Sequence, residues 1–167
     1  MKRVLLILSC FYLIMAGTFA QKNLSNVQKT FQNNILNFLK EESGEISSPT
    51  VNNDSEIEFK DSRGERHLIR ILPGSPFFVI LSREGYAIGG SRGLALNETL
   101  LAANQVNARM EVVKLICTER NQNRNLVFNI EQYFQTAEDF KYVFFRNLTL
   151  LENAEKNFLD EYNKQKR

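Results

Sequence analysis

The sequence predicts a single α+β domain, an antiparallel sheet of about five strands flanked by helices. Three segments carry apolar residues at intervals of three and four, the spacing of an amphipathic helix. Five shorter segments alternate apolar with other residues, as strands do, and short polar turns join them. The predicted order is therefore helix, three strands, helix, two strands and long helix.

The first 20 residues are predicted to be a signal peptide and not part of the fold. Two basic residues precede the apolar run 4–15, and small residues lead to Ala20, which is the layout of a Sec-type signal. We expect cleavage after Ala20, which leaves one domain over residues 21–167 in the periplasm or outside the cell. An uncleaved anchor is the alternative, but the run is shorter than the ~20 residues of a spanning helix. A lipid anchor at Cys10 is disfavoured because the apolar run continues past it.

Charge and cysteine content narrow the function classes. Without the first 20 residues, the chain carries 19 basic and 19 acidic residues. A neutral chain has no general attraction for a phosphate backbone, so nucleic acid is not an expected partner. Cys117 is then the single cysteine, which excludes an intramolecular disulfide, and its strand position favours a small core residue over a reactive thiol.

The first helix is predicted over residues 25–39. Val27, Phe31, Ile35 and Phe38 share one stripe, and Ser25 or Asn26 is suited to cap its start. The following stretch from 47 to 55 is rich in Ser, Asn and Asp and contains a proline, so it predicts a loop or an irregular edge.

Three strands follow this loop. The first begins at Ile57, a turn at 61–64 ends in glycine, and the second strand covers 67–72. The third strand, 77–81, is apolar on both faces, which predicts a central or covered strand. Residues 85–88 either extend the third strand or form a short further piece.

The stretch 97–158 forms the centre of the predicted fold. Asn97 is suited to cap a helix whose apolar face holds Leu100, Ala103, Val106 and Met110. From residue 111 the period changes to two, and a polar turn at 120–124 joins two strands into a hairpin. Thr136 and Asp139 then resemble a capping box for a long amphipathic helix that runs to about residue 163.

The same stretch carries a family resemblance. Ala-Ala-Asn-Gln-Val-Asn at 102–107, Val-Val-Lys-Leu at 112–115 and Ala-Glu-Asp-Phe at 137–140 resemble the YbjN-type family. These are small bacterial domains described as candidate sensory-transduction regulators, with a fold similar to type III secretion chaperones. The resemblance covers nearly all of the chain after residue 22. It implies a chaperone-like fold and a protein partner, with a homodimer as one form, and it implies no catalytic residues.

No catalytic, metal or cofactor site is predicted from the residues themselves. His67 is the one histidine and is interpreted as a solvated strand residue, since a triad or a histidine metal site needs further partners. Adjacent carboxylates at 41–42, 138–139 and 160–161 point about 100° apart on a helix, so they are interpreted as solvated surface. An enzyme whose carboxylates meet only in the fold stays open.

Two asparagines and three aromatic residues are the candidate structural or partner-binding residues. Asn104 and Asn107 are suited to bond backbone groups where the helix leads into the strand, with recognition as the alternative. Phe77, Phe78 and Tyr133 are expected to lie exposed on strand faces, where they would hold a partner.

The loop at Gly90, Ser91 and Arg92 is the candidate anion site. Glycines, a serine and an arginine before a helix are suited to hold an anion on backbone amides. The stretch lacks the fingerprint of a P-loop or a dinucleotide site, so a flexible connector is favoured.

The expected function is that of an exported, non-enzymatic protein-binding, chaperone-like or regulatory module. The alternatives are a carrier of a small apolar ligand held between the sheet and the long helix, or an enzyme using carboxylates from separate elements. A cavity would favour the carrier, a polar pocket with convergent acids the enzyme, and an apolar sheet face the binding module.

Overall fold

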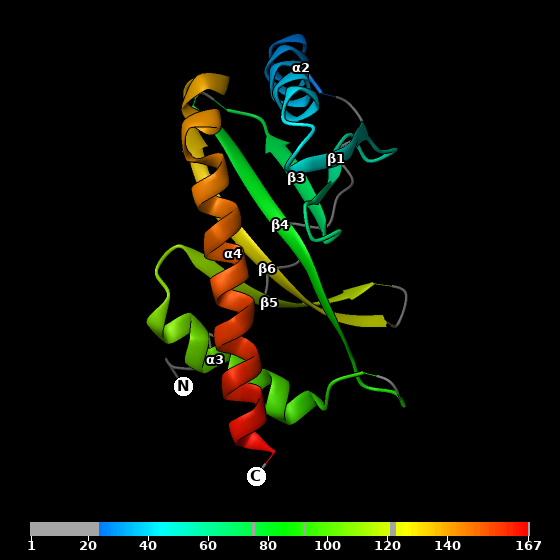
Figure 1. Ribbon diagram of the computed structural model, residues 1–167, viewed down its shortest axis with the longest axis vertical. Helices are drawn as coiled ribbons and strands as arrows, with labels where there is room; N and C mark the ends of the chain where they lie inside the picture. The colour runs from blue at the N-terminus through cyan, green and yellow to red at the C-terminus, as the bar shows by residue number, and fades with distance from the viewer. Residues whose placement is uncertain (1–23, 75, 92, 121–122, 167) are drawn as a thin grey trace, which may run out of the picture.

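The computed structural model describes residues 24–74, 76–91, 93–120 and 123–166, and the predicted signal peptide lies outside this range. The described chain forms one six-stranded antiparallel sheet with three helices, in the strand order β1-β2-β3-β4-β6-β5 (Figure 1). The elements are α2 (Asn26–Glu41), β1 (Ile46–Val51), β2 (Ile57–Asp61), β3 (Arg66–Leu72), β4 (Phe77–Ile88), α3 (Leu96–Arg109), β5 (Val113–Arg120), β6 (Asn123–Phe134) and α4 (Ala137–Gln165). The α+β class and the element order are confirmed, apart from one additional strand.

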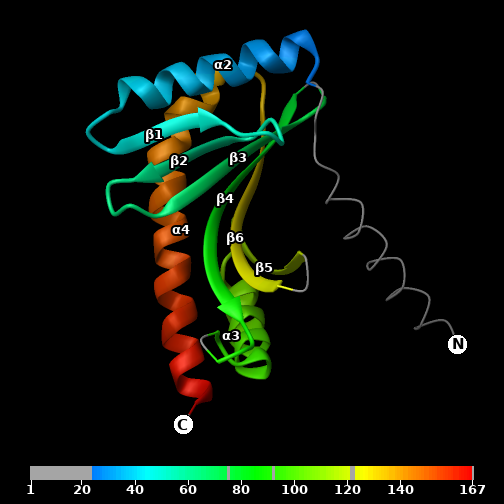
Figure 2. The ribbon, with the colours of Figure 1, turned by 90° about the vertical axis from the view of Figure 1, so that its right-hand side faces the viewer.

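The helices gather on one face of the sheet. Figure 2 shows the long strands β4 and β6 curving along α4, with α2 across the end formed by β1 to β3 and α3 near the other end of α4. No helix in the described part of the chain has the length and hydropathy of a bilayer crossing.

The additional strand is β1 (Ile46–Val51), which lies where the sequence predicts a loop or an irregular edge. Ile46 is its one buried residue, so the alternating pattern that marks a half-buried strand is missing. β1 pairs with β2 at the edge of the sheet, and its register shifts between Ser47 and Thr50. Pro49 lies within that shift, as expected for a proline in an edge strand.

β4 is one strand of 12 residues, so residues 85–88 extend the third predicted strand. Its register with β6 shifts between Glu84 and Ala87. At Gly85 the two strands approach so closely that an added Cβ would lie 2.3 Å from the Leu126 carbonyl oxygen. This irregularity interrupts the alternation, and for that reason both Arg83 and Tyr86 reach α4.

The helix starts agree with two of the three predicted caps. Capping boxes form between Ser25 and Gln28 and between Thr136 and Asp139. For α3 the prediction is wrong, because Ala95 occupies the cap position without a side-chain bond and Asn97 lies inside the helix.

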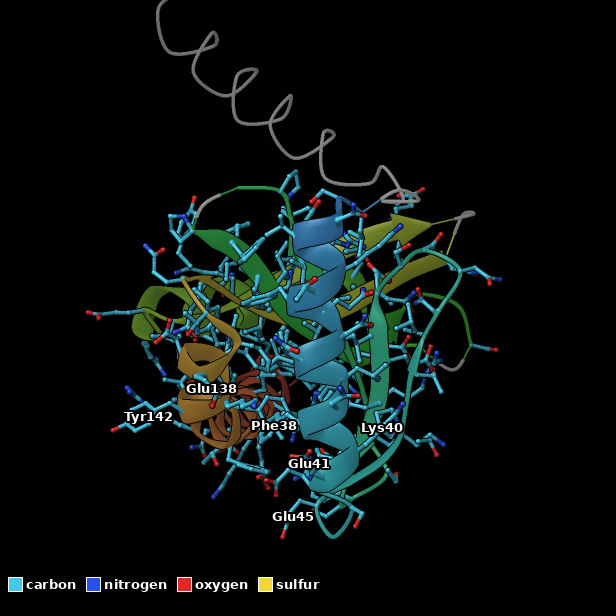
Figure 3. All side chains as sticks on the ribbon, turned by 90° about the horizontal axis from the view of Figure 1, so that it is seen from above. Phe38, Lys40, Glu41, Glu45, Glu138 and Tyr142 are labelled. Atoms are coloured by element: carbon cyan, nitrogen blue, oxygen red, sulfur yellow. The ribbon has the colours of Figure 1, made fainter. Side chains whose placement is uncertain are left out.

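The core lies between the helices and the covered face of the sheet. It is rich in phenylalanine: Phe59, Phe128, Phe140, Phe144 and Phe158 are each at most 1% exposed. Figure 3 shows Phe38 where α2 meets the start of α4. The centroid of its ring lies 5.5 Å from that of Phe144.

Single positions on two helices differ from the predicted stripes. Val27 is 66% exposed, and Gln28 is buried instead and donates to the Ile71 carbonyl oxygen. On α3, Leu100 is exposed, whereas Thr99 and Ala102 join Ala103 and Val106 in the buried face.

Candidate functional site

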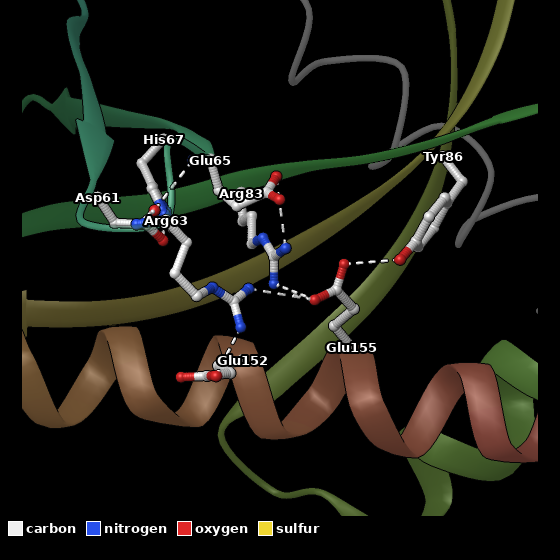
Figure 4. A network of polar contacts seen from close by, with 8 residues as sticks. All are labelled: Asp61, Arg63, Glu65, His67, Arg83, Tyr86, Glu152 and Glu155. Carbon is white, nitrogen blue, oxygen red and sulfur yellow. Dashed lines mark hydrogen bonds and ion pairs between the residues drawn. The ribbon is translucent and has the colours of Figure 1, made fainter.

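A group of buried and exposed polar side chains lies between the β2–β3 turn, β4 and α4 (Figure 4). We call it the Arg83 cluster. Its members are Asp61, Arg63, Glu65, His67, Arg83, Tyr86, Glu152 and Glu155.

Arg83 is the centre of this cluster because β4 directs it inward. Val79 and Leu81 precede it on the covered face, so the alternation of the strand carries the arginine into the core, where it is 2% exposed. A buried charge needs partners. Its Nη1 lies 2.6 Å from Glu155 and its Nη2 lies 3.5 Å from Glu65.

Glu155 connects the cluster to α4. Besides Arg83 it receives Arg63 at 3.4 Å and the Tyr86 hydroxyl, which donates at 2.7 Å. Burial acts to raise the pKa of Glu155, but hydrogen bonds from Tyr86 and Arg83 hold it below its usual value, so the carboxylate is ionised. Burial and the hydrogen bond to Glu155 raise the pKa of Tyr86 to about 12. The phenol therefore stays protonated at neutral pH and donates to the Glu155 carboxylate.

The β2–β3 turn adds a second carboxylate, Asp61. Its Oδ1 accepts from the backbone amides of Arg63 and Glu65 at 3.0 and 2.9 Å, and its Oδ2 lies 3.0 Å from His67 Nε2. Burial acts to raise the pKa of Asp61, but the bond to His67 and these backbone bonds lower it. Ionised Asp61 therefore accepts, and Nε2 of the imidazole donates.

His67 is buried, which corrects the predicted solvated position. It is 1% exposed and its ring stacks on Phe59 with centroids 5.0 Å apart. Burial lowers the pKa of His67 despite the bond to Asp61, so the imidazole is neutral at pH 7. Its Nδ1 forms no hydrogen bond with any described residue, and neither does Arg83 Nε.

A cavity of about 170 Å³ lies beside these groups, beneath the β2–β3 turn. Its polar lining comes from the turn, the strands and one residue before β1: Glu45, Asp61, Arg63, His67 and Arg83. Phe145, Leu148 and Glu152 close it on the α4 side. These residues are up to about a hundred positions apart in the sequence. The packing of α4 on the β2–β3 hairpin brings them together.

The cluster is a network of ion pairs and hydrogen bonds. Glu65, Glu152 and Glu155 pair with guanidinium groups, and Asp61 pairs with His67. No described residue forms a hydrogen bond with His67 Nδ1. Among the described residues, no group of three or more His, Cys, Asp or Glu could hold a metal ion.

No helix of the described residues lies on the opposite face of the sheet, and we call it the open face. Its apolar residues come from β3, β4, β5 and β6; most are half-buried, and Tyr133 is 68% exposed. The apolar residues of this face are Leu68, Leu72, Phe78, Ile80, Ile116, Val127 and Tyr133. Phe78 and Tyr133 pair across β4 and β6 with ring centroids 4.8 Å apart.

The three aromatic residues predicted to share exposed strand faces therefore separate. Phe78 and Tyr133 lie together on the open face, whereas Phe77 lies on the covered face, where its ring is 4.4 Å from Phe31 of α2. The structure does not bring Phe77 to the proposed binding surface.

Asn107 bonds the backbone of the strand that follows its helix. Its Nδ2 donates to the Leu115 carbonyl oxygen at 2.9 Å, and its Oδ1 accepts from the Leu115 amide at 2.7 Å. β5 lies at the edge of the sheet. There the Asn107 side chain gives Leu115 the hydrogen-bond donor and acceptor that a further strand would provide. Asn104 lies exposed on the same helix.

The glycine loop before α3 is closed by its own backbone. Gly89 donates to the Leu94 carbonyl oxygen and Leu94 donates to that of Ala87, both at 2.8 Å. Gly90 has a φ of 70° and Ser91 is exposed, while Arg92 lies outside the described residues. The anion site stays a prediction.

Two further residues differ from their predicted surroundings. Cys117 is exposed near the end of the β5–β6 hairpin and is not a core residue. Glu161, predicted as solvated, is buried on α4 and forms ion pairs with Arg109 at 2.6 Å and Lys164 at 2.9 Å.

A solved structure shares this architecture. The fold matches that of "YbjN, a putative transcription regulator from E. coli", with a TM-score of 0.53 and 15% sequence identity over 78% of this chain and 90% of that chain. No family model and no curated protein matches the sequence. The chain therefore has a YbjN-type fold, as the sequence motifs predict. The likeness to type III secretion chaperones stays a prediction.

The sequence holds a signal for the cluster that periodicity alone does not reveal. Arg83 occupies an inward position of an otherwise apolar row, and an inward charge needs partners from a facing element. Glu152 and Glu155, three apart on α4, lie on one side of that helix. Together these features predict an ion-pair network, but not which acid pairs with the arginine.

Proposed function

We propose that this chain is an exported, non-enzymatic protein-binding module of the chaperone-like or regulatory kind, and that the open face is its docking surface. The apolar open face with its Phe78–Tyr133 pair carries this proposal. Contiguous exposed apolar patches on soluble proteins mark interaction sites, and tyrosine is enriched where binding energy concentrates. The likeness to a structure described as a transcription regulator supports a regulatory or binding role.

The surroundings of the open face favour a protein as the occupant. Charges of both signs border its apolar centre, among them Arg66, which pairs with Glu58 at 2.7 Å and Glu84 at 3.2 Å. An apolar centre within a rim of mixed charge is the usual anatomy of a protein interface. A nucleic acid would require one dominant positive sign instead. The partner is a different protein or a second copy of this chain.

Binding accounts for the interior better than the alternatives do. Phenylalanine rings fill the space between the sheet and α4, where a carrier would need room for an apolar ligand. Glu65, Glu152 and Glu155 are held by Arg63 and Arg83, and Asp61 is held by His67, whereas the enzyme alternative requires convergent carboxylates that are free to act on a substrate.

Export rests on the amino-terminal sequence, and its test is direct. Amino-terminal sequencing of the protein purified from the periplasm or medium should begin at Gln21. A chain that retains Met1 and stays with the cytoplasmic fraction would contradict the proposed localisation.

Docking on the open face is tested with matched aromatic variants. Purified protein is used to capture partners from an envelope extract, and its mass is measured at about 100 μM by sedimentation equilibrium. Phe78→Ser and Tyr133→Ser should each abolish a captured partner or a dimer. Tyr142→Ser removes an aromatic ring that is 91% exposed on α4 and should leave both unchanged.

Two results would overturn the docking proposal. One is capture or dimerisation that is equal in all three variants, and the other is a monomeric wild-type chain that captures nothing reproducible. Circular dichroism of each variant separates loss of binding from loss of fold.

A further inference from the structure

We propose that the cavity beneath the β2–β3 turn binds a small organic cation, a primary ammonium group on a short apolar stem. This site lies on the covered side of the sheet and is independent of docking on the open face. Its volume is about 170 Å³. A cavity of ~150 Å³ accommodates one benzene molecule, so the ligand has roughly six non-hydrogen atoms.

The charge around the cavity selects a cation. Three carboxylates line it, Glu45, Asp61 and Glu152, against two guanidinium groups, Arg63 and Arg83. Glu65 and Glu155 are the ion-pair partners of Arg83. Each arginine already holds two of these carboxylates. An entering anion would have to displace acids that are fixed on α4, whereas a cation adds attraction in a partly dry site.

A second, independent feature of the cavity is that His67 presents a buried acceptor that needs a hydrogen-bond donor. The side chain lines the cavity and is 1% exposed, and its Nδ1 has no partner within the part of the chain that the structure describes. Because Nε2 donates to ionised Asp61, Nδ1 of the neutral ring carries a lone pair and accepts. Buried acceptors are normally paired, and an ammonium group has three N–H donors and no acceptor.

Other lining residues are placed to contact the remaining N–H groups and the apolar stem of such a ligand. Glu45 is exposed at the rim and Glu152 is half-exposed on α4, so both are placed to accept the further N–H groups. Phe145 and Leu148 form an apolar wall for the stem. A free alkylamine and a lysine side chain present the same group, and the experiment separates these two sources.

The test follows the single histidine of the chain by NMR. The full chain labelled with ¹⁵N is titrated with n-butylamine at pH 7.5, and the imidazole nitrogens are observed by long-range ¹H–¹⁵N correlation. We expect a saturable shift of the Nδ1 resonance. Glu45→Gln and Glu152→Gln should each weaken binding about fivefold, the effect of losing one exposed ion pair. Glu111→Gln, the same change at an exposed site before β5, should leave binding unchanged.

The probes decide what is recognised. n-Butanol lacks the charge, tetramethylammonium lacks the N–H donors, and inorganic phosphate has the opposite charge, so none should shift Nδ1 at 50 times the amine's Kd. Equal shifts with any of them, or no saturation by n-butylamine up to about 100 mM, would overturn the proposal and leave the cavity to water. Tighter binding of N-acetyl-lysine methylamide than of n-butylamine would support the ammonium site and assign it to a lysine of a protein.

Discussion

The two faces of the sheet are built from the same strands and are used in opposite ways. On the covered face, helices seal phenylalanine rings and enclose Arg83 and His67, each at most 2% exposed. On the open face, a comparable arginine, Arg66, pairs with Glu58 and Glu84 at 47% exposure, and Tyr133 stands in solvent. Alternation along a strand determines on which face of the sheet a side chain lies. Whether helices cover that face determines how strongly the side chain affects the free energy of unfolding.

The largest expected difference concerns the aromatic core. Phe144→Ala removes a ring that is 0% exposed, and it should lower the free energy of unfolding by about 3–5 kcal/mol because a cavity remains. Tyr142→Ala, two residues away and 91% exposed, should change it by less than about 0.5 kcal/mol. Urea unfolding followed by circular dichroism measures both. Similar losses in the two variants would contradict the assigned faces.

The second comparison sets the buried arginine against the exposed one. Arg83→Met should cost about 2–4 kcal/mol, because Glu155 and Glu65 lose their main partner inside the domain. Arg66→Met should cost at most about 1 kcal/mol, since exposed ion pairs contribute little.

A double variant sharpens this second comparison. Glu155→Gln keeps an acceptor for Tyr86 and removes the uncompensated charge, so it should recover part of the Arg83→Met loss. Additive losses in the double variant would mean that the two side chains are not coupled.

A smaller effect is expected at the edge of the sheet. Asn107→Ala leaves the Leu115 amide and carbonyl without their side-chain partner, and should cost about 1–2 kcal/mol. Hydrogen exchange of the Leu115 amide should accelerate. Asn104→Ala, at an exposed position of the same helix, is the control and should alter neither quantity. Unchanged Leu115 exchange in Asn107→Ala would contradict the edge role.

The smallest effect is the dependence of stability on pH. The pKa of His67 is lower in the folded chain than in the unfolded one, so the unfolded state binds the extra proton. The contribution of His67 to the free energy of unfolding is fully present above its unfolded pKa of about 6.5. As the pH decreases below that value, the contribution decreases by at most ~1.4 kcal/mol per pH unit. The lowered pKa of Asp61 extends the loss to lower pH, below about 3.8.

Urea unfolding at half-unit steps between pH 5 and 7.5 measures this dependence. His67 is the one histidine of the chain, so His67→Gln should flatten the slope in that interval. A slope that persists in the variant would assign it to another group.

The sequence predicts the elements of this fold better than it predicts the site. Burial is predictable where the apolar pattern is long and regular. Most apolar residues in the helical stripe of α4 and in the alternating pattern of β6 are buried. For β1 the sequence predicts only a loop or an irregular edge, because Ile46 is its one buried residue and backbone pairing with β2 leaves no mark in the side-chain pattern.

The Arg83 cluster could not be assembled from the sequence for a different reason. Whether His67 is solvated or buried depends on α4, whose contacting residues follow it by about eighty positions. Local pattern carries no information on how the long helix lies across the hairpin. The open face was partly predictable, since Phe78 and Tyr133 were named, but alternation places Phe77 on the other side.

The amide of Asn107 also determines where the sheet stops. An edge strand with free N–H and C=O groups is a template for the next chain, and repeated addition of such strands leads to aggregates. By occupying both polar groups of Leu115, this one side chain ends lateral growth along the first part of β5. The Asn107 side chain thereby disfavours edge-to-edge stacking of copies of this chain at Leu115.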